Sequence, residues 1–211
     1  MTTHLKTHIS PILNQLNGQL VVSCQPIDNG PMDQPDIVLS MALAAEIGGA
    51  GALRIEGVEN LKAVSSIIKL PIIGLVKHDL KNAPIRITPF IEDVQALAKN
   101  GANIIAYDAT DRLRPTTTTA LVNEIKNLNC LAMADCASLA DAKNAIKDGA
   151  DIIGTTLSGY AYNIAKSDEL PDYALIEQFS NLDCFVMAEG RFNSPALAGQ
   201  AMMHGANAVT V

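Results

Sequence analysis

Tryptophan is absent from this 211-residue chain, and phenylalanine and tyrosine each occur only four times. The apolar residues, 48% of the total, are therefore mostly alanine, isoleucine, leucine and valine. Small and branched side chains of this kind fill parallel sheets that are buried on both faces. The length suits one domain with a sizeable core better than two, and we expect a single domain over residues 1–211.

Long apolar runs and an excess of basic residues are also missing. No run reaches the length of a transmembrane helix, and the first residues, MTTHLKTHISPILNQL, lack the apolar stretch of a signal peptide. We therefore expect a cytoplasmic protein with no membrane partner. The formal net charge of −7 lacks the basic footprint that nucleic acid requires, so we expect no nucleic-acid partner. It still permits a small phosphorylated ligand, because a local cluster of N–H groups binds phosphate.

Metal-binding patterns are missing as well. Four cysteines occur, at Cys24, Cys130, Cys136 and Cys184. They form no CxxC pair, and we expect reduced thiols that pack in the core. Four histidines occur, at His4, His8, His78 and His204. They are too scattered to form a metal cage, so we expect no metal.

A short theme recurs four times, as IGGAGALRI, KNGANIIAYD, KDGADIIGTT and HGANAVTV. In each, a Gly-Ala pair precedes an apolar run, which predicts a helix that ends on a glycine cap and a tight turn into a buried strand. Similar apolar runs occur in QLVVSC, PIIGLV, CLAMAD and DCFVMAE. Together these runs predict eight strands, beginning near residues 20, 51, 72, 103, 131, 151, 184 and 207.

Helical periodicity fills the intervals between the strands. The expected helices are Asp36–Ile47, Glu59–Ile68, Ile91–Lys99, Thr117–Leu128, Leu139–Lys147, Tyr173–Phe179 and Ser194–Met203. Strict alternation of strand and helix implies parallel pairing, and eight such units favour a closed (β/α)8 TIM barrel. A doubly wound sheet is the alternative, but QLVVSCQP lacks the Gly-rich signal that usually follows its first strand. Residues 3–17 predict an extra helix that plugs the barrel's N-terminal end.

Polar residues end the odd-numbered strands, at the end of a barrel where active sites lie. Side chains alternate in direction along a strand, so Lys77 and Glu189 should point the same way as the apolar residues two and four positions before them, toward the interior. The same parity turns Gln25 and Asp135 inward. We expect these four residues to form the topmost layer of the barrel, with Lys77 and Glu189 facing each other across its mouth.

The even-numbered strands lead into further polar residues, Arg54, Asp108 and Thr155. Arginine is a natural clamp for an oxygen-rich ligand. Asp108 is expected to point inward, where it orients Lys77 or only hydrogen-bonds neighbouring loops. One charged residue at a strand end is usually solvated or ion-paired. Several that converge on one end of a barrel cost desolvation and like-charge strain, so their convergence indicates an active site.

Opposed acid and base groups suit a reaction at a carbon beside a carbonyl. Inverting such a carbon requires a proton to leave one face and another to arrive on the opposite face. A lysine and a glutamate tuned for proton transfer can share that work. A Schiff-base aldolase is the competing chemistry for a barrel lysine, and the position of Lys77 does not distinguish the two.

The strand-end motifs closely resemble those of the N-acetylmannosamine-6-phosphate 2-epimerase family. The resemblance covers nearly the whole chain, through VVSCQP, GGAGALRIEG, LPIIGLVKHD, RITPFIEDVQALAKNGANIIAYDAT, MADC, IIGTTLSGY, FVMAEGRFNSP and NAVTV. It implies interconversion of N-acetylmannosamine 6-phosphate and N-acetylglucosamine 6-phosphate by proton transfer at C2, during sialic acid catabolism and without a cofactor. Its specificity lies in the ordered set of motifs, since no single one would suffice.

Position by position, the resemblance implies that Lys77 and Glu189 are the catalytic acid–base pair. The implied substrate contacts are Gln25, Arg54 and Asp135, with Asp108, Thr155 and Tyr160 as further candidates. For the phosphate, the candidates are Gly190 and Arg191 after the seventh strand.

In one respect the chain departs from the family pattern. Family members continue past the last strand with a Gly-rich turn and a final helix, whereas this sequence ends at Val211. We expect the last barrel helix to be missing and the phosphate half of the site to be incomplete. Apolar surface should then be exposed at the seam, which favours a homodimer. The alternatives to an epimerase are another phosphosugar barrel, such as the aldolase, and a barrel that binds a phosphosugar without turnover.

Overall fold

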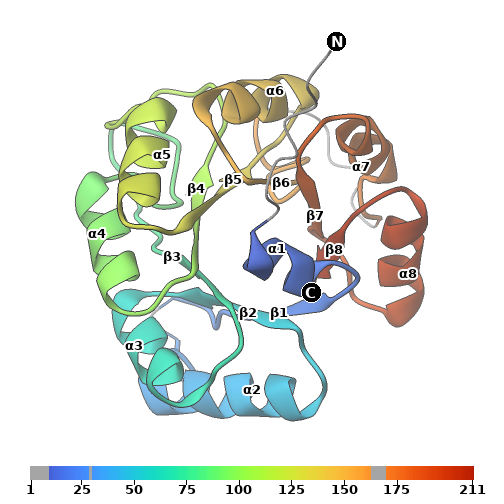
Figure 1. Cartoon of the computed structure of the whole chain (residues 1–211). Coiled ribbons are helices and arrows are strands. Elements are labelled where there is room, and N and C mark those ends of the chain that lie inside the picture. Colours follow the sequence, from blue (N-terminus) through green and yellow to red (C-terminus); the bar gives the residue numbers. More distant parts are fainter. Residues whose placement is uncertain (1–9, 29, 163–169) are drawn as a thin grey trace.

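The computed structural model describes residues 10–28, 30–162 and 170–211, which form a closed barrel (Figure 1). The strands are β1 (Leu20–Cys24), β2 (Ala52–Glu56), β3 (Ile72–Leu75), β4 (Ile104–Asp108), β5 (Leu131–Asp135), β6 (Ile152–Gly154), β7 (Phe185–Glu189) and β8 (Ala208–Thr210). Each strand pairs in parallel with the next one in the sequence, and β8 pairs with β1 to close the ring. The eight predicted strands and the (β/α)8 barrel are confirmed.

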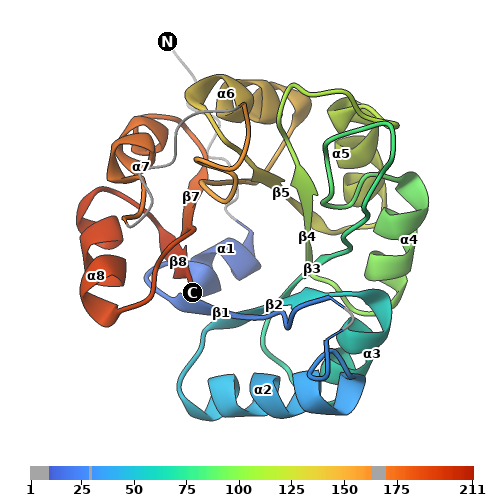
Figure 2. The same ribbon diagram turned by 180° about the vertical axis from the view of Figure 1, so that it is seen from behind.

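Helices surround the barrel in the order in which they occur along the chain (Figures 1 and 2). They are α2 (Pro35–Ile47), α3 (Val58–Ile67), α4 (Ile91–Lys99), α5 (Thr118–Asn127), α6 (Leu139–Asp148), α7 (Tyr173–Ser180) and α8 (Pro195–Met203). Each lies within one residue of its predicted bounds. Side-chain oxygens fix several of the starts: Thr117, Ser138, Asp172 and Ser194 each accept a hydrogen bond from a backbone N–H of the first turn.

Within the helix expected over residues 3–17, the structure describes α1 at Pro11–Leu16. Residues 3–9 of that prediction lie outside the described residues. Leu16 is fully buried in the cluster of apolar side chains that fills the barrel, and Ile12 and Leu13 pack against the same cluster. Figure 1 shows α1 lying across the barrel axis. This helix therefore closes one end of the barrel, as predicted.

The barrel interior is built from layers of four side chains. The strand register, followed around the ring, shows which side chains share a layer. The two lower layers are apolar: Ala52, Ile104, Ile152 and Ala208, then Val21, Ile73, Met133 and Met187. The two layers above them include polar residues. The first consists of Arg54, Ala106, Gly154 and Thr210, and the second of Ser23, Leu75, Asp135 and Glu189.

The predicted inward parity of the odd-numbered strands is confirmed, because the apolar residues that precede their polar ends belong to this interior cluster. The predicted common layer is wrong. Asp135 and Glu189 share a layer with Ser23 and Leu75. Gln25 and Lys77 stand two residues beyond Ser23 and Leu75 on their strands, and so lie farther toward the mouth. The cause is the stagger between neighbouring strands of a tilted barrel, which parity within one strand does not report.

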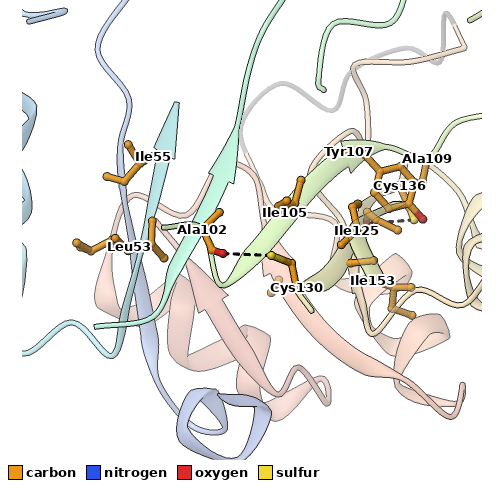
Figure 3. Packing of buried hydrophobic residues seen from close by; sticks show 14 of the residues in the cluster. Leu53, Ile55, Ala102, Ile105, Tyr107, Ala109, Ile125, Cys130, Cys136 and Ile153 are labelled. Carbon is orange, nitrogen blue, oxygen red and sulfur yellow. Dashed lines mark hydrogen bonds between the residues drawn. The ribbon is translucent and has the colours of Figure 1, made fainter. Parts of the chain in front are cut away.

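A second apolar cluster lies between the strands and the outer helices (Figure 3). It contains the outward-facing strand residues, such as Leu53, Ile105 and Ile153, and also Cys24 and Cys136. All four cysteines are free, and burial raises the pKa of the Cys136 thiol well above its usual range. These thiols therefore pack as small apolar groups, as predicted.

Apolar surface is exposed where β8 meets β1. Beside α8, the outer face of these strands borders a hollow lined by Leu20, Phe192, Asn193, Ser194, Pro195, Ala198 and Val211. Leu20 and Val211 keep 40% and 39% of their surface exposed, so the expected apolar seam is present. Within the described ranges, no helix is long and apolar enough to cross a membrane.

Candidate active site

Arg54 is the centre of the charged network at the barrel mouth. It points inward from β2 and is only 2% exposed. Its guanidinium donates to both oxygens of Asp135, over 3.2 Å from Nη1 and 2.7 Å from Nη2, and Nη1 also reaches Glu189 Oε2 at 2.8 Å. The long side chain fits because its layer includes the small residues Ala106 and Gly154. One buried cation thus holds two carboxylates from strands β5 and β7.

Asp135 is fully buried at the end of β5. Besides the two bonds from Arg54, its Oδ1 accepts a hydrogen bond of 2.7 Å from the Thr156 hydroxyl. Asp135 therefore places a carboxyl group with three hydrogen-bond donors beside Glu189.

Glu189 occupies the end of β7, and its side chain is 14% exposed. Burial raises the pKa of its carboxyl to about 7; Arg54, Thr156 and Lys77 act to lower it, and Asp135 to raise it. The balance leaves a carboxyl group that exchanges a proton near neutral pH. A group of this kind can act as an acid or a base without a large cost in either state.

Thr155 fixes the main chain of Glu189. Its hydroxyl donates to the Glu189 carbonyl oxygen at 2.9 Å and accepts from the Glu189 N–H at 3.0 Å. These contacts tie the end of β7 to the segment that follows β6. The structure thus places the Thr155 side chain against the main chain of Glu189.

Lys77 stands two residues after Leu75, the last residue of β3, and lies farther toward the mouth than Glu189. An isolated bridge to Ile87 holds its backbone, and its N–H donates to Glu56 Oε1 at 3.2 Å. Its ammonium nitrogen lies 3.9 Å from Asp28 Oδ1. The positive charge also acts to lower the pKa of Glu189, so the two predicted catalytic groups are electrostatic neighbours.

The rim of the mouth carries Gln25 and Tyr160. Gln25 donates from Nε2 to the Ser23 hydroxyl at 2.7 Å, which fixes its amide above β1. Tyr160 is 56% exposed, and the guanidinium carbon of Arg191 lies 5.8 Å from the centre of its ring. Both side chains are therefore placed where a ligand in the mouth can reach them.

Asp108 organises a loop. Its carboxylate accepts from the backbone N–H of Thr110 at 3.0 Å and from the guanidinium of Arg112 at 2.7 Å. Arg114 donates to its backbone oxygen at 2.9 Å. Of the two roles expected for Asp108, these contacts match the bonding of neighbouring loops.

Gly190 and Arg191 turn the chain after β7. Gly190 has a φ of 106° and Arg191 a φ of 66°, the left-handed region that glycine adopts freely and arginine rarely. The Arg191 guanidinium donates to the carbonyl oxygens of Leu170 at 2.7 Å and Ser158 at 2.9 Å. It therefore ties the segment after β6 to the end of β7.

Two inward residues at the mouth escaped the sequence analysis, Thr156 and Glu56. Both follow the parity of their strands: Glu56 stands two positions after Arg54, and Thr156 two positions after Gly154. Extending each strand by one more inward position would have found them. Within the described part of the chain, no cluster of three His, Cys, Asp or Glu side chains is placed to hold a metal ion.

The sequence and the fold are both similar to known proteins. A family model described as "Putative N-acetylmannosamine-6-phosphate epimerase" matches residues 38–211. A Pasteurella multocida protein named "Putative N-acetylmannosamine-6-phosphate 2-epimerase" is 51% identical over 200 residues, 95% of this chain and 87% of the relative. A Vibrio vulnificus protein of the same name is 54% identical over 196 residues, 93% of this chain and 86% of the relative. The solved N-acetylmannosamine-6-phosphate 2-epimerase from Clostridium perfringens matches with a TM-score of 0.91 and 36% identity, covering 100% of this chain and 92% of that one.

Proposed function

Because the chain belongs to the N-acetylmannosamine-6-phosphate epimerase family, we propose that it interconverts N-acetylmannosamine 6-phosphate and N-acetylglucosamine 6-phosphate in sialic acid catabolism. The observation that carries the proposal is the neighbourhood of Lys77 and Glu189, whose pKa is raised to about 7. This places a near-neutral acid–base group within electrostatic reach of an amine, as C2 inversion requires.

The proposed mechanism uses the open-chain sugar, in which C2 lies beside the C1 aldehyde. One residue of the pair removes the C2 proton and leaves an enolate; the other delivers a proton to the opposite face. Arg54 holds the Glu189 carboxylate, and the charges of Arg54 and Asp135 act on its pKa in opposite directions. Each catalytic group ends one pass in the opposite protonation state, and the reverse reaction or solvent restores it.

Substrate contacts are proposed along the rim of the mouth. Gln25 and Tyr160 present polar atoms there, and Arg54 and Asp135 form the charged floor beneath the sugar. For the phosphate we propose the turn after β7, where the backbone of Gly190 and the guanidinium of Arg191 lie. Arg191 bonds two carbonyl oxygens in this structure, so phosphate binding would redirect part of that guanidinium.

The function is tested by following C2 with NMR in deuterated water. Whichever epimer is supplied, we expect the other epimer to accumulate and to carry deuterium at C2. Borohydride trapping of a substrate adduct on Lys77, without C2 exchange, would instead indicate the Schiff-base aldolase. Substrate that binds and neither exchanges nor converts would indicate a phosphosugar-binding barrel.

We further propose a cytoplasmic homodimer in which a second copy of the chain covers the apolar seam. A contiguous apolar hollow beside β8 and β1 is the kind of surface that a protein partner buries. Sedimentation analysis should show a dimer, and a charge placed in the hollow by Ala198→Glu should shift the protein to monomer. A wild-type protein that sediments as a monomer at micromolar concentration would contradict this assignment.

A further inference from the structure

We propose that Thr156 is a positioning residue of the acid–base site, holding Asp135 and Glu189 from the β6 side while Arg54 holds them from the β2 side. The inference rests on the proposed function, since it assigns a role within the same site. Its basis is a hydrogen bond of 2.7 Å from the Thr156 hydroxyl to Asp135 Oδ1. Hydrogen bonding by Thr156 also acts to lower the pKa of Glu189.

Room for the hydroxyl depends on a missing side chain below it. Gly154 is the inward residue of β6 two positions earlier, and a Cβ there would lie 3.0 Å from Thr156 Oγ1 and 3.1 Å from Met133 Cε. Both distances are shorter than ordinary carbon contacts. The glycine therefore leaves the space in which the hydroxyl reaches the two carboxylates.

A hydroxyl suits this position because it carries one proton and two lone pairs. It donates to Asp135 in the structure, and rotation about one bond turns the same donor toward Glu189 when that carboxylate is ionised. Arg54 cannot serve this purpose alone, because its fork is fixed on both carboxylates at once. Thr156 thus adjusts to the protonation state of Glu189 without movement of the backbone.

The groups around Glu189 determine in which direction its pKa should change when the Thr156 hydroxyl is lost. Arg54 from β2, Asp135 from β5, Lys77 after β3 and Thr156 after β6 all act on its carboxyl. Of these, Asp135 raises the Glu189 pKa, and Thr156 lowers it by hydrogen bonding to the charged form. Loss of the hydroxyl should therefore raise the pKa of Glu189. The pH limb that reports Glu189 should move to higher pH whether the residue serves as acid or base.

The test compares Thr156→Val, which keeps the shape and removes the hydroxyl, with Thr156→Ser, which retains it. We expect Thr156→Val to lower kcat about 10- to 100-fold, the range of a hydrogen bond to a charged group. Carbon-13 NMR titration of the glutamate carboxyls in ligand-free protein should show the Glu189 pKa raised by about one unit. Thr156→Ser should restore both values. Thr119→Val, on the exposed face of α5, is the matched control and should leave both unchanged.

Three outcomes would overturn the proposal: an unchanged Glu189 titration in Thr156→Val, equal impairment of the valine and serine variants, or loss of the fold in Thr156→Val. The last would show that the hydroxyl serves the barrel and not the site. Because the titration needs no substrate, it reports on Thr156 even if the wild-type protein shows no C2 exchange. Failure of the proposed function is thereby distinguished from failure of this inference.

Discussion

Replacing Lys77 with methionine is expected to lower kcat for epimerisation by about 10²- to 10⁴-fold, the range that a positioned acid–base group contributes. Methionine keeps the length of the side chain and removes the amine. Glu189→Gln should cause a loss of the same size, because glutamine accepts hydrogen bonds but cannot carry the transferred proton. Coupled assays of the two epimers give kcat in each direction. Lys143→Met, on an exposed part of α6, controls for a general lysine effect and should match the wild type.

Deuterium exchange at C2 of each epimer separates the roles of Lys77 and Glu189 more clearly than kcat does. An enzyme that keeps one group of the pair can still remove the proton of the epimer whose C2–H faces that group. Lys77→Met and Glu189→Gln should therefore exchange C2 deuterium slowly into opposite epimers, with little conversion in either. Exchange into the same epimer by both variants would contradict the assignment of one residue to each face.

The pH profile gives an independent check on Glu189. With a pKa raised to about 7, its carboxyl changes charge within the working range of a neutral enzyme. The wild-type rate should show a limb near that value, and Glu189→Gln should lack it. A limb near 7 that persists in the variant would assign the titration to another group.

The strands, the helices and the inward parity of the mouth residues were all accessible from the sequence. Each depends on local patterning: the Gly-Ala turns mark where strands begin, and alternation along β3 and β7 turns Lys77 and Glu189 inward. Local rules sufficed because a (β/α)8 barrel repeats one short unit, with neighbours in sequence adjacent in space. The helix bounds were close for the same reason, since side-chain caps such as Thr117 and Ser138 stand in the sequence beside the turns they stabilise.

The partners of the charged residues were not accessible in this way. Lys77 and Asp135 share a parity but lie in different layers, because strand stagger is a property of the closed ring. Arg54 pairs with Asp135, 81 positions later in the sequence, and with Glu189, 135 positions later, and both pairings depend on that same stagger. Arg191 and Asp108 illustrate a second limit, since their backbone and loop partners depend on loop conformations that no periodicity reports. The inward direction of the mouth residues therefore followed from pattern, whereas their hydrogen-bond and ion-pair partners required coordinates.

Arg54→Met is expected to destabilise the fold by about 3–5 kcal/mol at pH 8, the cost of breaking a buried ion pair by removing one partner. The guanidinium is 2% exposed and holds both Asp135 and Glu189, so its loss leaves two buried carboxylates without their shared ion-pair partner. Denaturant unfolding at pH 5.5 and pH 8 measures the effect. Activity should fall with stability, because Glu189 loses the contact that fixes its position.

The destabilisation should depend on pH with a definite sign. The charge of Arg54 acts to lower the pKa of Glu189, so without Arg54 the folded-state pKa of Glu189 rises further above 7. A group whose folded pKa exceeds its unfolded value binds more protons in the folded state, so its contribution to stability is present at low pH and lost as pH rises through the folded pKa. The free energy of unfolding of Arg54→Met should therefore lie nearer that of the wild type at pH 5.5 than at pH 8.

Adding Asp135→Asn and Glu189→Gln to Arg54→Met should restore most of the lost stability at pH 8, because the three charges of the network are then all removed. Equal destabilisation at both pH values, or no recovery in the triple variant, would show that Arg54 stabilises the barrel by packing and not by neutralising the two carboxylates.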